Sequence, residues 1–283
     1  MSLRVGVVGV GAMGVGMARA MLAKGLAVGA RDLVEARERE AMAAGATALS
    51  ECDVLVSVVV DAEQTRDVVR EHAHRAPTFM MCSTIAPSDT EAIAAELAAR
   101  GIEILDAPIS GGPARAEAGT LSMMASGSES AFARCEPVIA STTSKCFRIG
   151  ERPGDGSRMK VVNNMLAAAN LAAGCEAMAM AAKLGLDLRQ AADVVNASSG
   201  ASWIFADRMP RALDGDYAPR AAARVLLKDV GLFVHEARRF GLTAPMAECA
   251  REIFHDTVAR GLAEEDDAAV LKRYAAAWGI RIA

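Results

Sequence analysis

A lysine and an asparagine near the middle of the chain have residue types and spacing that suit work on one substrate. Lys160 and Asn164 are four residues apart near the start of a long run of helix formers, so both project from one face of a helix. Apolar neighbours partly desolvate the lysine, and desolvation favours the neutral amine, which can accept a proton near physiological pH. The pair predicts acid–base chemistry, with a solvated lysine at the helix edge as the alternative.

A serine followed by two glycines forms a second candidate site. The sequence Asp-Ala-Pro-Ile-Ser-Gly-Gly-Pro follows a strand-like run, so Ser110, Gly111 and Gly112 are predicted in a loop at the carboxyl edge of a sheet. Ligands bind at that edge in open α/β sheets. A hydroxyl beside successive glycine N–H groups suits a carboxylate, whereas a turn that only reverses the chain is the alternative.

A glycine-rich turn at the start of the chain is typical of dinucleotide binding. Gly9, Gly11 and Gly14 follow the apolar run 5–8 with the spacing G-x-G-x-x-G, and Asp32 ends a second apolar stretch. The first glycine permits a tight turn, the second lets backbone approach a pyrophosphate, and the third lets the next helix pack on the sheet. The pyrophosphate then caps that helix, whose N-terminal N–H groups carry partial positive charge.

Two neighbouring residues bear on the choice of cofactor. A carboxylate at Asp32 can hydrogen-bond the ribose hydroxyls of NAD and repels an added 2′-phosphate, whereas Arg31 can receive that phosphate. We expect NAD, with NADP less favoured. Thr84 follows another strand-like run and is a candidate contact to the nicotinamide, with helix capping as the alternative. The expected cofactor contacts also include Ala12, Met13, Val59 and Val60.

Alternating strand-like and helical runs predict that a Rossmann-type α/β domain positions these residues. Up to about residue 150, short β-branched runs alternate with Ala-rich helical segments, which is typical of a parallel sheet with crossover helices. The strand-like runs are 5–8, 26–30, 54–60, 79–82, 102–105 and 121–125. Apolar and polar residues do not alternate within these runs, as expected when both faces of the sheet are covered.

The second half of the chain predicts helices alone. After a Pro-Gly-Asp-Gly segment, helix formers with almost no polar face run from about Ser157 to Leu184, with Gly185 as a C-cap. A helix apolar all round must be buried on most sides. We predict an NAD-binding domain over 1–156 and an all-helical substrate and dimerisation domain over 157–283. The apolar helix surface favours a homodimer or homotetramer.

Composition argues against several classes of partner and site. The 283 residues carry a formal net charge of −4 with no long block of one sign, which argues against a nucleic-acid partner. The first apolar stretch fits the glycine fingerprint and is too short to span a bilayer, so we expect a cytoplasmic protein with no membrane partner. The six cysteines lack C-x-x-C spacing and are expected to be reduced and buried, and no metal site is expected.

The order and spacing of these motifs resemble the β-hydroxyacid dehydrogenase family, which includes 3-hydroxyisobutyrate dehydrogenase. The fingerprint, the Ser-Gly-Gly segment and the segment 154–164 carry the likeness, and residues 228–232 (Lys-Asp-Val-Gly-Leu) resemble a fourth family motif. The likeness covers essentially the whole chain. It implies reversible oxidation of a 3-hydroxy acid, with hydride passing to nicotinamide C4 while Lys160 accepts the hydroxyl proton.

The resemblance also implies a role for each candidate residue. Lys160 is the catalytic acid/base, and Asn164 assists in the site. Ser110 with its two glycines holds the substrate carboxylate. Thr84 and Lys228 approach the cofactor.

The segment around Trp203 bears on the substrate. Residues 198–205 (Ser-Ser-Gly-Ala-Ser-Trp-Ile-Phe) and the residues that follow resemble the L-threonate dehydrogenase branch most, which implies a small polyhydroxylated four-carbon acid. Ala221 stands where an aromatic residue often borders the pocket, so its small side chain makes room for hydroxyls, or Trp203 or Phe205 supplies the wall. Oxidation of 3-hydroxyisobutyrate and reduction of tartronate semialdehyde are alternatives within the family.

Two alternatives lie outside this reaction. Imine reductases share the architecture, but their usual pattern lacks a lysine at position 160. A catalytically silent NAD(P)-binding module is the other alternative, since some relatives have lost that lysine. Joint retention of Lys160, Asn164 and Ser110 argues against both.

Overall fold

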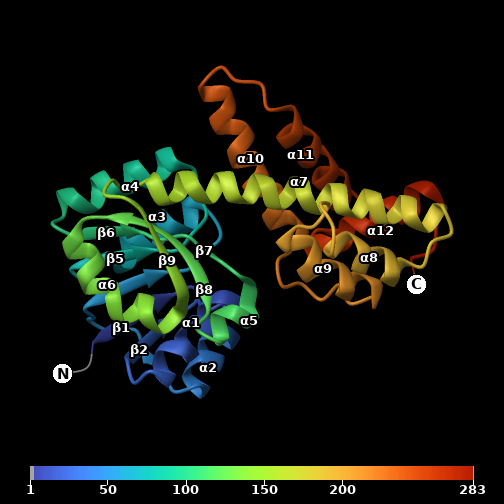
Figure 1. Cartoon of the computed structure of the whole chain (residues 1–283). Helices are drawn as coiled ribbons and strands as arrows, with labels where there is room; N and C mark the ends of the chain where they lie inside the picture. The colour runs from blue at the N-terminus through green and yellow to red at the C-terminus, as the bar shows by residue number, and fades with distance from the viewer. Residues whose placement is uncertain (1–2, 283) are drawn as a thin grey trace. The chain divides into compact units, whose positions relative to one another are not determined.

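A computed structural model describes residues 3–282 and divides the chain into two compact units (Figure 1). The units are Met1–Lys160 and Val161–Ala283, and the division falls within the long helix α7 (Asp155–Lys183). Every described strand belongs to the first unit, and the second unit is built from helices. The predicted fold class, a Rossmann-type domain followed by a helical domain, is confirmed.

Nine described strands form one sheet in the first unit. They are β1 (Arg4–Val8), β2 (Ala27–Arg31), β3 (Thr47–Ala48), β4 (Val54–Ser57), β5 (Thr78–Met81), β6 (Glu103–Asp106), β7 (Ile109–Ser110), β8 (Leu121–Gly127) and β9 (Thr143–Gly150). The strand order is β3-β2-β1-β4-β5-β6-β8-β7, and β9 pairs with β8. The first six strands in this order, from β3 through β2, β1, β4 and β5 to β6, are parallel. Their carboxyl ends therefore share one edge of the sheet.

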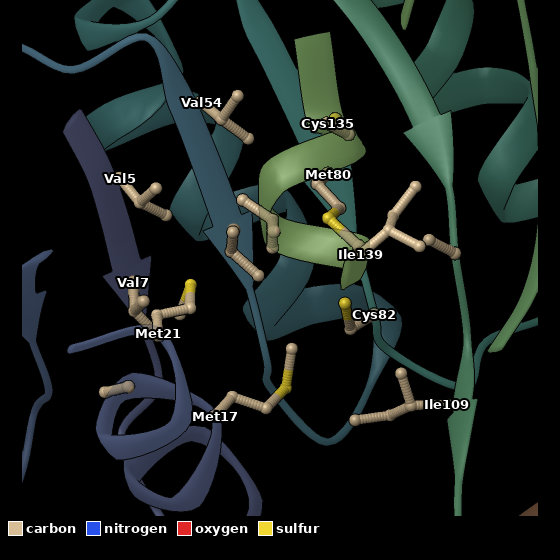
Figure 2. Close-up of a cluster of buried hydrophobic side chains, with 14 of the residues drawn as sticks. Val5, Val7, Met17, Met21, Val54, Met80, Cys82, Ile109, Cys135 and Ile139 are labelled. Carbon is tan, nitrogen blue, oxygen red and sulfur yellow. The ribbon is translucent and has the colours of Figure 1, made fainter. Parts of the chain in front are cut away.

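Helices cover both faces of this sheet because its strands are apolar on both sides. They are α1 (Ala12–Ala23), α2 (Glu35–Ala43), α3 (Ala62–His72), η1 (Ala73–Arg75), α4 (Pro87–Ala99), α5 (Gly112–Glu117) and α6 (Glu129–Thr142). Figure 2 shows one face, where Val54 and Met80 of the sheet lie with Met17 of α1 and Ile139 of α6. Intervening strand residues such as Phe79 pack with α3 and α4 instead.

The sheet departs from the prediction at its last strands. Strand β8 runs antiparallel to β6 and β7, so the sheet is mixed rather than wholly parallel. Strands β3, β7 and β9 were not predicted. The first two are only two residues long, and β9 is largely exposed and polar, so none of the three presents an apolar run.

The second unit packs its helices around an apolar core. After α7 come α8 (Leu188–Asn196), α9 (Trp203–Leu213), α10 (Ala223–Arg239), α11 (Pro245–Thr257), η2 (Val258–Leu262), η3 (Asp267–Ala269) and α12 (Val270–Trp278). Leu171 of α7, Phe205 of α9 and Phe254 of α11 are among the buried core residues. Gly185 follows α7 with φ +76°, as expected for its predicted C-cap role.

Helix α7 is less buried than its composition predicted. By length and composition it could cross a membrane, but the core helix of a soluble protein meets the same test, which makes this weak evidence. Only 39% of its most apolar window is buried within the chain. Val162, Leu166 and Met180 are exposed, so the expectation of burial on most sides is wrong for this chain by itself.

The cysteines are free thiols in different environments. Cys52, Cys82, Cys135 and Cys175 are buried, as predicted, whereas the prediction is wrong for Cys249, which is exposed on α11. Cys146 is half-buried. Burial raises the pKa of Cys52 to about 11 and the pKa of Cys135 to about 12.

Candidate active site

The fingerprint glycines form the turn between β1 and α1. Gly9 has φ +89°, and a Cβ on Gly14 would lie 1.9 Å from the Gly9 carbonyl oxygen, so this packing requires glycine. The N-cap of α1 is Gly11, no side chain caps the helix, and its first turn has no acidic residue. The N–H groups of Ala12 and Met13 therefore begin a helix whose N-terminus suits an anion. This geometry fits the pyrophosphate of a dinucleotide.

Asp32 connects the end of β2 to the glycine turn. Its carboxylate is buried, with Oδ2 accepting a hydrogen bond from the Val10 N–H (2.8 Å) and Oδ1 accepting one from the Val34 N–H (2.8 Å). Each oxygen keeps a second lone pair. Asp32 thus shapes the turn and retains acceptor capacity for a ligand hydroxyl.

Glu38 of α2 lies against the same strand end and was missed by the sequence analysis. Its Oε2 accepts hydrogen bonds from Arg31 Nη1 (2.7 Å) and from the Asp32 N–H (3.2 Å). The hydrogen bond from Arg31 lowers the pKa of Glu38, although partial burial opposes the shift. No sequence signal separated Glu38 from its neighbours, because α2 is charged along most of its length.

Residues after β4 and β5 lie at the same edge of the sheet as the glycine turn. Val59 and Val60 follow β4, and the Val60 N–H donates to Gln64 Oε1 (3.2 Å). Thr84 follows β5. The N-cap of the next helix, α4, is Ala86, so the alternative interpretation of Thr84 as a helix cap is wrong.

The Ser-Gly-Gly segment is more ordered than the predicted loop. Ser110 belongs to β7 and pairs with Ser122 of β8, while Gly112 begins α5. Gly111 and Gly112 have φ +136° and +79°, which L side chains rarely adopt. The segment is a strand-to-helix turn, and the two-residue strand is too short to be recognised from an apolar pattern.

Asp106 at the end of β6 fixes the start of α7. Its buried carboxylate accepts hydrogen bonds from the N–H groups of Gly154 and Ser157 (2.9 Å each) and from the hydroxyls of Ser157 (2.8 Å) and Ser126 (3.2 Å). Burial raises the pKa of Asp106 despite these donors. The strand before the Ser-Gly-Gly turn and the helix that carries Lys160 are therefore joined by one side chain.

The first turn of α7 packs directly on backbone of the sheet. The Gly156 N–H donates to Ser126 Oγ (2.9 Å), and a Cβ on Gly156 would lie 2.4 Å from the Met124 carbonyl oxygen. Lys160 follows one turn later and is 6% exposed. This low exposure confirms the predicted desolvation of the lysine. The close approach at Gly156 holds the start of the helix against the sheet.

Asn164, within the second unit, forms a buried polar pair with Asp229 of α10. Asn164 Nδ2 donates to Asp229 Oδ2 (2.6 Å), and Asn163 Nδ2 donates to Asn164 Oδ1 (3.0 Å), so the Asn164 amide is fixed in orientation. Lys228 Nζ lies 2.6 Å from Asp229 Oδ1. The buried carboxylate of Asp229 therefore has a polar partner at each oxygen, as a buried charge requires.

The two candidate aromatic residues of α9 lie in different environments. Trp203 is the first residue of the helix and is 52% exposed, with Ser202 Oγ accepting from the Phe205 N–H (3.2 Å) as an N-cap. Phe205 belongs to the core and lies against Gly174 of α7, where a Cβ would meet its ring at 2.5 Å. Of the two, only Phe205 is buried in the core.

Comparisons with known proteins cover both units. Residues 4–150 match the NAD binding domain of 6-phosphogluconate dehydrogenase, and residues 154–274 match the model described as NAD-binding of NADP-dependent 3-hydroxyisobutyrate dehydrogenase. L-threonate dehydrogenase of Escherichia coli (strain K12) is 40% identical, over 95% of this chain and 93% of the relative. NAD-dependent L-serine dehydrogenase of Pseudomonas aeruginosa is 31% identical, over 94% of this chain and 96% of the relative.

A solved structure is also similar to this chain over both of its parts. The crystal structure of 3-hydroxyisobutyrate dehydrogenase from Salmonella typhimurium is 40% identical and has a TM-score of 0.90, covering 96% of this chain and 100% of that one. Its match spans the Rossmann-type and helical parts together. The chain therefore belongs to the 3-hydroxyisobutyrate dehydrogenase-like β-hydroxyacid dehydrogenases and is an NAD(P)-dependent oxidoreductase that acts on CH–OH donors.

Proposed function

We propose that this enzyme oxidises L-threonate at its 3-hydroxyl group with NAD as the acceptor. Proteins named L-threonate dehydrogenase that are 36–40% identical over at least 95% of this chain support the substrate. The structural observation that carries the proposal is the burial of Lys160 one turn beyond the point where α7 is fixed to the sheet. An amine held there is desolvated and positioned by the fold rather than free on a surface.

Lys160 acts as the acid/base. Its neutral amine accepts the proton of the substrate hydroxyl while the C–H bond at the same carbon breaks and the C–O bond becomes a carbonyl. The nicotinamide ring, when bound, accepts the hydride released from that carbon. In the reverse direction the ammonium form returns the proton to the carbonyl oxygen.

Ser110 and the two following glycines hold the substrate carboxylate. A hydroxyl and N–H groups from residues with positive φ make a concave set of donors, which suits an anion. Asn164, with its amide fixed by Asp229, binds the substrate through its remaining hydrogen-bonding capacity. Trp203 contacts the substrate through its exposed ring.

Residues at the carboxyl edge of the sheet would hold the cofactor. The turn formed by Gly9, Gly11 and Gly14 and the start of α1 hold the pyrophosphate. Asp32, with Arg31 beside it, faces the adenosine ribose and favours NAD. The remaining contacts are Ala12, Met13, Val59, Val60, Thr84 and Lys228.

We further propose that the protein is a cytoplasmic homodimer or homotetramer. Exposed apolar side chains on α7, including Leu166 and Met180, support self-association because a monomer leaves them in water. No nucleic-acid or membrane partner is proposed. The native molecular mass, measured by light scattering on the purified protein, tests the oligomeric state.

Initial rates with a substrate panel test the proposed reaction. Purified protein is assayed with NAD and with NADP against L-threonate, D-threonate, 3-hydroxyisobutyrate, L-serine and glycerate. We expect L-threonate with NAD to give the highest kcat/KM. Higher turnover of another 3-hydroxy acid would contradict the substrate assignment, and silence across the panel would favour a binding module.

A lysine variant tests the mechanism separately. Lys160→Ala should lower kcat by about 10²–10⁴, the range for loss of a general acid/base. It should bind NAD with unchanged affinity in calorimetry. Turnover within a few-fold of wild type would contradict the assigned role of Lys160.

A further inference from the structure

The carboxylate of Glu38 bonds to two groups at the end of β2. Its Oε2 accepts from Arg31 Nη1 (2.7 Å) and from the Asp32 N–H (3.2 Å), and Arg31 Nη1 also donates to the Asp32 carbonyl oxygen (3.1 Å). The Glu38 side chain is 18% exposed, and the Arg31 side chain is 46% exposed. One half-buried carboxylate therefore holds both an accessible guanidinium and the backbone of the next residue.

This arrangement limits what Arg31 can bind. An arginine at this position can receive the 2′-phosphate of NADP, because guanidinium and phosphate form bidentate, charge-assisted hydrogen bonds. Here Nη1 of the guanidinium is already bound to the Glu38 carboxylate and to the Asp32 carbonyl oxygen. A 2′-phosphate that binds the remaining N–H groups of Arg31 must share its positive charge with Glu38 and must approach the carboxylates of Glu38 and Asp32.

The same arrangement does not weaken the binding of NAD, which has no 2′-phosphate. A ribose hydroxyl is neutral and can donate to a carboxylate lone pair, so the carboxylates of Asp32 and Glu38 do not repel it. The charges of Asp32 and Glu38 together exceed that of Arg31. The cluster therefore distinguishes a neutral hydroxyl from a dianionic phosphate.

We propose that Glu38 is a specificity-determining residue that favours NAD over NADP by pairing with Arg31 and so reducing the positive charge that Arg31 offers to a 2′-phosphate. It acts through Arg31 and needs no contact with the cofactor, so it is a positioning residue. This inference rests on the proposed cofactor site at the end of β2.

The Glu38→Gln variant tests the inference by direct binding. Glutamine keeps the size of the side chain and removes its charge. Dissociation constants for NAD and NADP are measured by calorimetry in low salt, without substrate. We expect the Kd for NADP to fall about tenfold and the Kd for NAD to change less than about threefold.

A charge-matched control comes from the same helix. Glu40 also belongs to α2 and accepts a hydrogen bond from Arg19 Nη2 (2.9 Å), away from Arg31. Glu40→Gln removes one negative charge from α2 and should leave both dissociation constants within twofold of wild type. An equal gain in NADP affinity in this control would overturn the inference, because the effect would then follow net charge.

A variant of Arg31 completes the test. The double variant Arg31→Ala/Glu38→Gln should lose the gain in NADP affinity, because that gain depends on the guanidinium released from Glu38. A gain that survives in the double variant overturns the inference. If wild-type protein binds neither dinucleotide, the proposed cofactor site itself is wrong.

Discussion

Asp106 in the first unit and Asp267 in the second are both buried carboxylates, but their partners differ in kind. Asp106 accepts hydrogen bonds from backbone N–H groups and serine hydroxyls. Asp267 is held by the guanidinium of Arg208, whose Nε donates to Oδ1 (2.7 Å). Fixed backbone donors impose direction, whereas a guanidinium supplies charge. The first unit thus uses a carboxylate to position a helix, and the second uses one in an ion cluster.

The ion cluster in the second unit contains two adjacent carboxylates. Arg208 Nε also lies 3.7 Å from Asp266 Oδ1, and Asp266 Oδ2 accepts from the Arg220 N–H (3.0 Å). Burial raises the pKa of Asp267 to about 7 although Arg208 opposes the shift. Burial also acts to raise the pKa of Asp266, but hydrogen bonds and Arg208 outweigh it and lower that pKa. One of the two carboxyls therefore titrates near neutral pH.

Removing the shared cation should have the largest effect. Arg208→Met leaves Asp267 buried without its guanidinium, whereas Asp266 keeps Arg211 Nη1 at 3.5 Å. Loss of one partner of a buried ion pair costs about 3–5 kcal/mol. Urea unfolding at pH 7.5 measures this change. The control is Arg189→Met, which removes an exposed ion pair with Asp214 and should leave the free energy of unfolding nearly unchanged. Equal losses in the two variants would show that the buried cluster contributes no more than a surface pair.

Replacing the directional carboxylate should have the next largest effect. Asp106→Asn puts an amide donor among groups that donate, so we expect a loss of about 2–4 kcal/mol in the free energy of unfolding. Urea unfolding followed by circular dichroism measures it. Asp155→Asn, at the start of the same helix but bonded to Arg158 near the surface, is the matched control and should cost less than about 1 kcal/mol.

The pH dependence of stability tests the raised pKa of Asp267. Because the folded pKa of Asp267 lies above its unfolded value of 3.8, its protonated form favours folding, and this contribution is lost as pH rises from about 4 through about 7. In Asp267→Asn the side chain stays neutral and this loss disappears. We expect the melting temperature to fall between pH 5 and pH 8 by about 3 °C more in wild type than in the variant. Parallel pH profiles of the two proteins would contradict the raised pKa.

Much of the first unit could be predicted from sequence because its signals are local. The glycine spacing and six apolar runs identified the turn at Gly9 and strands β1, β2, β4, β5, β6 and β8. Strand β9 was missed because an exposed strand beside β8 needs no apolar run. Gly185 was recognisable as a C-cap because φ > 0 favours glycine at that position.

The contacts that position the candidate residues were not predictable, because they join distant parts of the chain. Asp106 bonds to Ser157 and Asn164 bonds to Asp229, and neither pair leaves a periodic or motif signal in one sequence. Glu38 was hidden for another reason, since charged residues on a surface helix usually mark only a solvated face. The sequence therefore identified the candidate residues and their order along the chain. The tertiary structure was needed to show which side chains position these residues.

Because the thiols differ in burial, Cys249 is a selective site for attaching a thiol-reactive label. Alkylating reagents react with the thiolate, and burial raises the pKa of Cys52, Cys82, Cys135 and Cys175, so these side chains are both inaccessible and protonated at pH 7. Burial also raises the pKa of Cys146, which is half-buried. A maleimide dye at neutral pH should therefore modify α11 first, so the native sequence can carry one fluorophore on its helical unit without an engineered cysteine.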